Sequence, residues 1–380
     1  MILGRKSFVD LSFRRDIPRR RISFPRRALL IVAPCIAFCL AFVSFAACKK
    51  GEPRARGPVR VGVLTQNLFF GDNLLGLARF SARGKSPRAL LRKARKLTRG
   101  ILRNIRFHDF PARARGIAAK IALLRPDAIG LQEAFLIRER RGLPGGWTVR
   151  HDYLKELQSA LKRKNLSYTV AAVLENTDEE IPLDGRGSAL RITDRLAVLV
   201  GPGVRVRSQK SGRFRNVLRK NLVLRTISFP RGYIKVDLEK SGRVFRLITT
   251  HLERLGRYKY EQNEELLRLF EKPDRPQLIA GDFNVDPGRG PGMYRDWRRR
   301  HYDAWEKKRG KAKGGTCCFR IPLTDRRHFP GSRFDLIFAT EEFHPLRVKR
   351  VYARVDSRVP RPKKIWTSDH AGLFAELELR

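Results

Sequence analysis

Residues 128–133, Ala128-Ile129-Gly130-Leu131-Gln132-Glu133, join an apolar run to an amide and a carboxylate. A short apolar run of this kind is typical of a buried strand. Gln132 and Glu133 then lie at the carboxyl end of the strand, where open α/β sheets place their ligand sites. The stretch therefore predicts an α/β fold with polar chemistry at its strand ends.

The segments before this stretch predict a β-α-β unit. Residues 59–64 alternate apolar and other side chains, which indicates a first strand that ends at Asn67. Asp109-Phe110-Pro111 opens a helix over 112–124, because proline is suited to a first helical turn. Residues 86–107 carry apolar side chains at helical spacing, with Arg and Lys on the other side. This amphipathic helix is either a solvated helix packed on the body, or a basic lid or membrane-facing element.

The remainder of the chain continues the pattern of many strands and few long helices. A helix is predicted over 153–161, and strands over 168–174, 196–200, 232–238, 244–249, 278–280, 334–338 and 373–378. No repeat and no second domain boundary is present in the sequence. These elements predict one domain over 59–380, built as a layered α/β sandwich with much antiparallel sheet.

Polar clusters also follow four other apolar runs: Thr65-Gln66-Asn67, Thr250-His251, Gly281-Asp282-Phe283-Asn284 and Ser368-Asp369-His370. Magnesium prefers oxygen ligands and keeps several waters, so Glu133 and Asn67 suit it. An imidazole close to a carboxylate can act as an acid or a base near neutral pH. Each cluster alone is also compatible with an ordinary turn. Together they predict a hard-cation site with acid-base partners.

These clusters resemble the motifs of the endonuclease/exonuclease/phosphatase superfamily, whose members include DNase I-like nucleases and bacterial sphingomyelinases. The resemblance extends to Arg333-Phe334-Asp335-Leu336 and to residues 366–372, and it keeps the family's motif order over nearly all of 59–380. The chain is similar to exported bacterial members. The resemblance implies a four-layer α/β sandwich, in which helices flank two packed, mixed and largely antiparallel sheets.

The resemblance also implies a metal centre and an activated water. Asn67, Glu133 and Asp369 would hold Mg²⁺, with Mn²⁺ and Ca²⁺ as alternatives. Asp282 would orient or deprotonate the attacking water, and Asn284 would hold a phosphate oxygen.

Three further residues are carried over as contacts of the phosphate and the leaving group. His370, oriented by Asp335, would contact the phosphate or assist the water. His251 would stabilise or protonate the leaving oxygen, and Arg231 would bind phosphate.

The function implied is a metal-dependent phosphodiesterase, whose substrate is a nucleic acid or a phospholipid headgroup. In-line attack on a phosphodiester needs an activated water, a cation and help for the leaving group, and the implied roles supply all three. The alternative is a non-catalytic, envelope-anchored protein that binds polyanions on the same fold. The presence of every implied site residue favours the enzyme. We infer no obligate protein partner.

The charge of the chain is strongly positive. Its 380 residues include 82 Lys and Arg against 37 Asp and Glu, a net charge of +45, while 42% hydrophobic residues are ample for a core. Such a surface attracts polyanions, although an arginine-rich proteome would give the same composition.

The N-terminal segment predicts export. Nine basic residues within 1–27 precede an apolar run over 28–47, which is typical of a secretion signal. Ala46-Ala47-Cys48 resembles a bacterial lipoprotein box, so Cys48 would be lipidated and 48–58 would be a basic tether. The alternatives are an uncleaved membrane anchor, since about 20 apolar residues can span a bilayer, and plain secretion. Each of these places the domain outside the cytoplasm, at the cell envelope or beyond it.

Cysteine usage agrees with export. Cys35 and Cys39 lie in the apolar segment, so the predicted domain holds only Cys317 and Cys318. Zinc-type spacing is absent from the sequence. The adjacent pair is either a vicinal disulfide or a pair of buried thiols.

Overall fold

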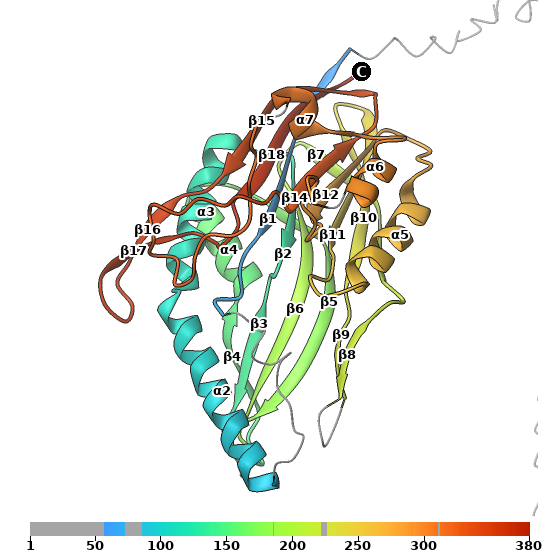
Figure 1. Cartoon of the computed structure of the whole chain (residues 1–380). Coiled ribbons are helices and arrows are strands. Elements are labelled where there is room, and N and C mark those ends of the chain that lie inside the picture. The colour runs from blue at the N-terminus through green and yellow to red at the C-terminus, as the bar shows by residue number, and fades with distance from the viewer. Residues whose placement is uncertain (1–56, 73–85, 185, 222–225, 290, 311) are drawn as a thin grey trace, which may run out of the picture. The chain divides into compact units, whose positions relative to one another are not determined.

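The fold is a sandwich of two β-sheets with helices on both outer faces (Figure 1), as seen in a computed structural model. The structure describes residues 57–72, 86–184, 186–221, 226–289, 291–310 and 312–380. The predicted export segment and Cys48 lie outside these residues, as does most of the predicted tether. Residues from Ala55 to Arg380 form one unit of contacts.

The first sheet contains eight strands of the described chain. Their order is β15 (Phe343–Val351), β18 (Gly372–Leu379), β1 (Val59–Asn67), β2 (Ala128–Gln132), β6 (Ala189–Val200), β3 (Leu136–Arg140) and β4 (Trp147–Asp152), with β5 (Thr169–Pro182) paired to β6. Only β1 and β2 run parallel among these pairs, as a β-α-β crossover requires.

The second sheet has the same mixed character. Its order is β13 (Tyr302–Asp303), β14 (Asp335–Ala339), β12 (Gln277–Asp282), β11 (Arg243–His251), β10 (Gly232–Lys240) and β7 (Val204–Arg213). The β11–β12 pair is parallel and the other pairs are antiparallel. Two small hairpins stand apart, β8 (Leu218–Asn221) with β9 (Thr226–Phe229) and β16 (Arg354–Ser357) with β17 (Lys363–Trp366).

Helices cover the outer face of each sheet. The first sheet carries α2 (Pro87–Phe107), α3 (Phe110–Leu124) and α4 (Tyr153–Lys162), and the second carries α5 (Tyr258–Phe270) and α6 (Pro291–Trp297). The short helix α7 (Ala304–Arg309) packs beside β14 and β15. This confirms the predicted four-layer sandwich. None of the helices in the described residues is long and apolar enough to cross a membrane.

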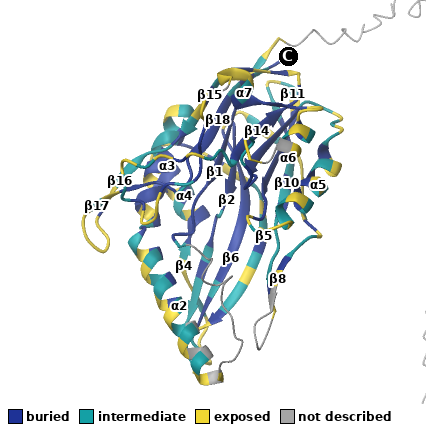
Figure 2. Ribbon diagram, viewed as in Figure 1, coloured by how far each residue is buried: buried dark blue, intermediate teal, exposed yellow. Residues whose placement is uncertain are grey.

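Three apolar clusters fill the three gaps between layers, and strand periodicity separates them. Along β1, Val61 and Val63 face the other sheet, whereas Leu64 faces the helices. Along β12, Ala280 faces the first sheet and Ile279 faces α5. Successive side chains of a strand point to opposite faces, so the central strands of both sheets are buried on both sides (Figure 2), whereas β7 at the edge of the second sheet is largely exposed.

The two sheets approach each other closely at Gly130. A Cβ at this position would overlap the side chain of Thr249 on β11, so only glycine lets β2 lie this near the second sheet. Beside it, the Gln132 amide donates to Thr249 Oγ1 at 3.1 Å and its Oε1 accepts from Thr65 Oγ1 at 3.2 Å. This buried polar contact sets the relative position of the strand ends.

The buried histidine His301 makes the stability of this fold depend on pH. It is 3% exposed, its Nε2 accepts from the Gln277 amide at 3.0 Å, and burial lowers its pKa to about 4. Its folded pKa lies below its unfolded value, so the unfolded chain binds the proton first. We expect the free energy of unfolding to fall between about pH 6.5 and pH 4, with about 3 kcal/mol attributable to this residue.

Urea unfolding from pH 7 to pH 4 measures this effect. His301→Gln should flatten the pH dependence, because glutamine stays neutral, while the exposed His344→Gln should leave it unchanged. An identical pH slope in wild type and His301→Gln would contradict the assignment.

Candidate active site

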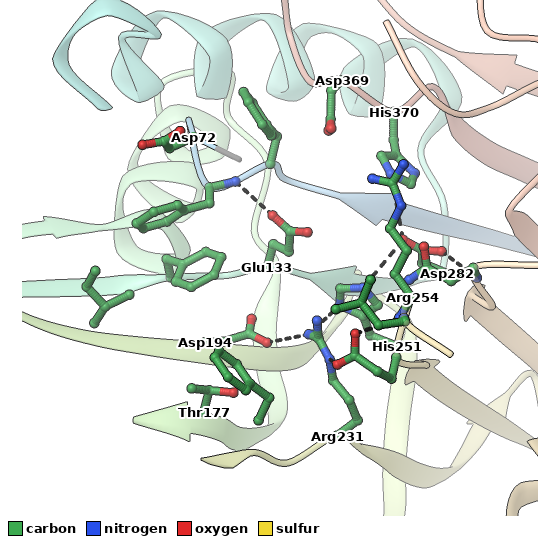
Figure 3. A pocket seen from close by; sticks show the side chains of 18 of the residues that line it. Asp72, Glu133, Thr177, Asp194, Arg231, His251, Arg254, Asp282, Asp369 and His370 are labelled. Carbon is green, nitrogen blue, oxygen red and sulfur yellow. Dashed lines mark hydrogen bonds and ion pairs between the residues drawn. The ribbon is translucent and has the colours of Figure 1, made fainter. Parts of the chain in front are cut away.

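The polar clusters predicted from the sequence lie together at one end of the sandwich. Asn67 ends β1 and Glu133 follows β2, while His251 ends β11 and Asp282 ends β12. Register places His251 opposite Asp282 and Asp282 opposite Asp335. Figure 3 shows Glu133, His251, Asp282, Asp369 and His370 around one cavity.

The Asn67 side chain joins the two sheets at this end. Its Nδ2 donates to Glu133 Oε1 at 3.1 Å and to Asp282 Oδ2 at 3.2 Å. Its Oδ1 accepts from the backbone N–H of Phe69 at 2.9 Å. The amide nitrogen therefore faces the carboxylates, and the amide oxygen orients the turn after β1.

Glu133 is a carboxylate with little neutralising charge around it. Its Oε2 accepts from the backbone N–H of Phe70 at 2.8 Å, and its φ of 55° is a left-handed conformation that is costly for glutamate. Burial, followed by the nearby Asp369, raises its pKa to about 7. Burial also raises the pKa of Asp369. Two buried carboxylates whose ionisation is disfavoured are a donor set that a divalent cation fits.

His370 is paired with Asp335, as predicted. Its Nδ1 lies 2.8 Å from Asp335 Oδ2, and its Nε2 lies 3.7 Å from Asp282 Oδ2. Although burial opposes it, the charges of Asp335 and Asp282 hold the pKa of His370 well above its usual value. His370 is therefore an imidazolium. Asp282, Asp335 and His370 are close enough to hold a metal, but this internal charge pairing favours an acid-base role for them.

Asp282 lies at the centre of the site. It is 1% exposed, and its Oδ1 accepts from the backbone N–H of Asn284 at 2.9 Å. Burial raises its pKa to about 6. Asn284 has a φ of 51°, and its Nδ2 donates to the carbonyl of Leu252 at 2.8 Å. Both residues line the cavity.

His251 is in the opposite charge state from His370. Its Nδ1 lies 3.1 Å from Arg231 Nη1, which can only donate, so the ring proton belongs on Nε2, 3.5 Å from Asp282 Oδ2. Burial, together with the Arg231 charge, holds the pKa of His251 well below its usual value. His251 is therefore a neutral imidazole whose N–H points to the centre of the site.

Arg231 lines the cavity, but its donors are directed to protein groups. Its Nη1 also donates to Asp194 Oδ2 at 2.8 Å, and its Nε lies 3.5 Å from Glu253 Oε2. Asp194 and Glu253 were not predicted from the sequence, because neither stands in a recognisable motif. Asp194 lies within β6. Glu253 lies two residues after His251, and this proximity was the available signal.

A third missed residue is Arg113, which is fully buried in α3. Its guanidinium donates to the carbonyls of His108, Leu68, Phe69 and Thr367 at 2.6–3.2 Å. These bonds tie the turn after β1 to the segment that carries Asp369. An arginine among the small apolar residues of 112–117 was the signal in the sequence.

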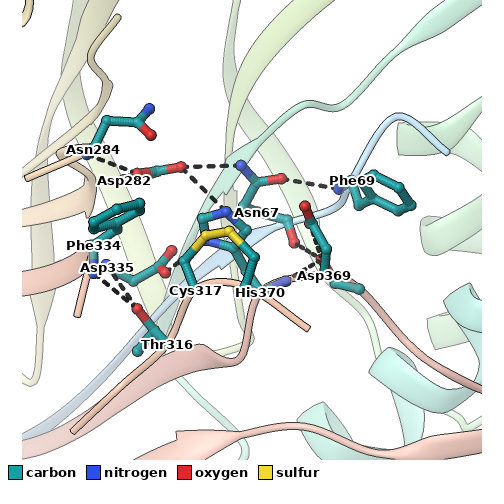
Figure 4. The surroundings of a disulfide bond; sticks show 12 residues. Asn67, Phe69, Asp282, Asn284, Thr316, Cys317, Phe334, Asp335, Asp369 and His370 are labelled. Atoms are coloured by element: carbon teal, nitrogen blue, oxygen red, sulfur yellow. Dashed lines mark hydrogen bonds and ion pairs between the residues drawn. A yellow bond between two sulfur atoms is a disulfide. The ribbon is translucent and has the colours of Figure 1, made fainter. Parts of the chain in front are cut away.

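Cys317 and Cys318 form a vicinal disulfide beside His370 (Figure 4). Ala371 N donates to the carbonyl of Thr316 at 2.8 Å, and Phe319 N donates to the carbonyl of Asp369 at 2.7 Å. Thr316 Oγ1 also accepts from the backbone N–H of Asp335 at 3.0 Å. The disulfide segment therefore braces both members of the Asp335–His370 pair.

A family model described as the Endonuclease/Exonuclease/phosphatase family matches residues 65–370. A family protein of known structure from Bacteroides thetaiotaomicron is 18% identical with a TM-score of 0.53, over 85% of this chain and 99% of that chain. A mannosyl-6-phosphatase from the same organism is 18% identical with a TM-score of 0.50, over 83% and 99%. A family protein from Leptotrichia buccalis is 15% identical with a TM-score of 0.50, over 83% and 99%. Comparison with curated protein sequences gives no match.

Removal of the Asp335 charge should lower the pKa of His370. In metal-free Asp335→Asn, we expect the His370 ring to titrate at least about one pH unit below wild type, since it loses its hydrogen-bonded anion. NMR of protein with labelled histidine measures this directly. Asp286→Asn removes a neighbouring carboxylate that accepts from the Arg333 backbone, and it should leave the titration unchanged. Equal titration of His370 in both variants would rule out the pairing.

Proposed function

Because this chain belongs to the endonuclease/exonuclease/phosphatase family, we propose that it is a metal-dependent phosphodiesterase that uses a water molecule to hydrolyse its substrate. One observation supports this most strongly. Asp282 Oδ2 lies 3.2 Å from the Asn67 amide, 3.5 Å from His251 Nε2 and 3.7 Å from His370 Nε2. A buried carboxylate between two imidazoles in opposite charge states can exchange protons with a substrate.

Glu133 and Asp369 would hold the cation, with Asn67 beside them. Burial raises the pKa of both carboxyl groups, which fits a site that a divalent ion completes. Mg²⁺ suits carboxylate oxygens, with Mn²⁺ and Ca²⁺ as alternatives. When bound, such an ion would supply charge stabilisation to the phosphoryl oxygens.

Asp282 would orient the attacking water and accept its proton. A pKa of about 6 leaves this carboxylate ionised at neutral pH, yet basic enough to accept a proton in the transition state. The Asn284 backbone N–H holds one carboxylate oxygen in place, so the other faces the imidazoles. The side chain of Asn284 would bind a phosphate oxygen.

The two histidines would have different tasks. His370, held as an imidazolium by Asp335, would donate to a phosphoryl oxygen. His251 is neutral with its proton on Nε2, so it would stabilise the leaving oxygen as a hydrogen-bond donor. Arg231 would position His251, and its predicted contact with phosphate requires that the Asp194 pair rearrange.

A polyanion-binding protein is the second candidate function, and helix α2 supports it. The 21 residues of α2 include no acidic side chain, and Arg88, Arg92, Lys96, Arg99 and Arg103 are exposed. Such a helix attracts nucleic acid or an anionic membrane surface. Binding of this kind is compatible with catalysis. If the protein hydrolyses no substrate, polyanion binding would be its only function.

Hydrolysis of bis-p-nitrophenyl phosphate tests the enzyme. We expect turnover with Mg²⁺, loss of turnover with chelator, and about a 10³-fold lower kcat in Asp282→Ala, which lacks the proton acceptor. Asp356→Ala, on the exposed side of β16, should retain full activity. Activity that survives chelation, or equal kcat in both variants, would contradict the mechanism. If the protein hydrolyses no phosphoester, polyanion binding remains the proposed function.

We also propose that the domain is held at the cell envelope, outside the cytoplasm, by a lipid on Cys48. The sequence Ala46-Ala47-Cys48 after an apolar run supports this. Cys48→Ser should prevent lipidation, so that the chain either stays unprocessed or is released in soluble form. Fractionation and mass spectrometry of the N-terminus measure both outcomes. An unchanged membrane-bound chain with an intact N-terminus would instead support an uncleaved anchor.

A further inference from the structure

We propose that the substrate of this site is an amphiphilic phosphoester, with a single phosphate next to a hydrophobic group that enters the active-site cavity. The proposal rests on the phosphodiesterase function above. It selects the lipid-type substrates over nucleic acid, a choice that the catalytic residues leave open.

The cavity that holds the catalytic residues also has an apolar lining. Its volume is about 420 Å³, which is larger than a phosphate group requires. Buried apolar side chains, none more than 5% exposed, form much of this lining; they include Phe70, Phe135, Ile181, Ile192, Leu218 and Ile227. A site for phosphate alone would not need such a lining, because apolar side chains give phosphate no hydrogen bonds.

Four of these apolar side chains lie on strands that carry none of the proposed metal-binding, proton-transfer or phosphate-binding residues. Ile181 lies on β5, Ile192 on β6, and Leu218 and Ile227 on the β8–β9 hairpin. Phe70 and Phe135 contact each other, with ring centroids 4.4 Å apart, beside Glu133. The lining thus extends from the predicted metal ligand toward the hairpin.

The charge of the cavity is unsuited to a chain of phosphates. Seven carboxylates are among its described lining residues, against three arginines, although the whole chain has a net charge of +45. Arg231 is already paired with Asp194 and Glu253. Nucleic-acid binding depends on several Lys and Arg contacts to successive phosphates, and these side chains lie elsewhere, as on α2.

The exposed lining residues have an amphiphilic pattern. Ile321 is 45% exposed, Phe229 and Leu255 are half-buried, and Arg254 and Arg320 are exposed. An apolar group can enter over the first three, while Arg254 suits the single phosphate that accompanies it; Arg320 lies 3.8 Å from Asp325 Oδ2. This pattern fits a substrate with a charged head and a hydrophobic body.

A series of alkyl p-nitrophenyl phosphodiesters tests the proposal, because the leaving group stays constant. With Mg²⁺ and monomeric substrate, kcat/KM should rise about fourfold per methylene from methyl to hexyl, until the cavity is filled. The p-nitrophenyl ester of thymidine 5′-phosphate should be a poorer substrate than the hexyl ester. A flat series, or a preference for the thymidine ester, would overturn the proposal.

Two substitutions on β9, which supplies part of the cavity lining, test where the alkyl group binds. Ile227→Thr and Phe229→Ala should each lower kcat/KM for the hexyl ester about tenfold or more, and leave the methyl ester unchanged. Val173→Ala, an exposed apolar position on β5 outside the cavity, is the control.

Equal losses of kcat/KM with both esters would show a structural effect and refute the subsite. Turnover of the methyl ester without any dependence on chain length would refute this inference alone, whereas no turnover of either ester would refute the phosphodiesterase itself.

Discussion

The side-chain amide of Asn67 is the interaction on which the site depends. It donates to Glu133 after a strand of one sheet and to Asp282 at the end of a strand of the other. Two packed sheets can slide relative to each other unless polar contacts fix their register. Here Asn67 sets the distance between the proposed metal ligands and the proposed proton acceptor. The hydrogen bond from Gln132 to Thr249 also joins the two sheets.

The two imidazoles of this buried cavity have opposite charge states. Arg231 donates to Nδ1 of His251 and keeps that ring neutral, whereas Asp335 accepts from His370 and keeps that ring charged. Both residues are deeply buried, so desolvation alone would make both neutral. Specific partners therefore decide the protonation states. Arg231 lies directly before β10, the neighbour of β11, and Asp335 begins β14 of the same sheet.

Much of this arrangement could be predicted from the sequence, since the family motifs stand directly after apolar runs. The strands β1, β2, β11 and β12 were predicted from these apolar runs, and the structure confirms them. The Asp335–His370 contact was implied by the family resemblance, and the structure places His370 Nδ1 2.8 Å from Asp335 Oδ2. Other elements have no apolar signal. Helix α5 buries Gln262 and Asn263, which form hydrogen bonds within the core, and β7 is almost wholly exposed. Asp194 and Arg113 were missed because long-range folding alone brings them to the site.

Glu133 and Asp369 are proposed to hold a divalent cation, next to an acid-base group that binds no metal. A crystal structure with Mn²⁺, with the ion located by its anomalous scattering, distinguishes these two groups. We expect one strong peak within coordination distance of Glu133 and Asp369, with the His370–Asp335 pair intact. A peak bound instead by Asp282, Asp335 and His370, or no peak at millimolar Mn²⁺, would contradict this proposal.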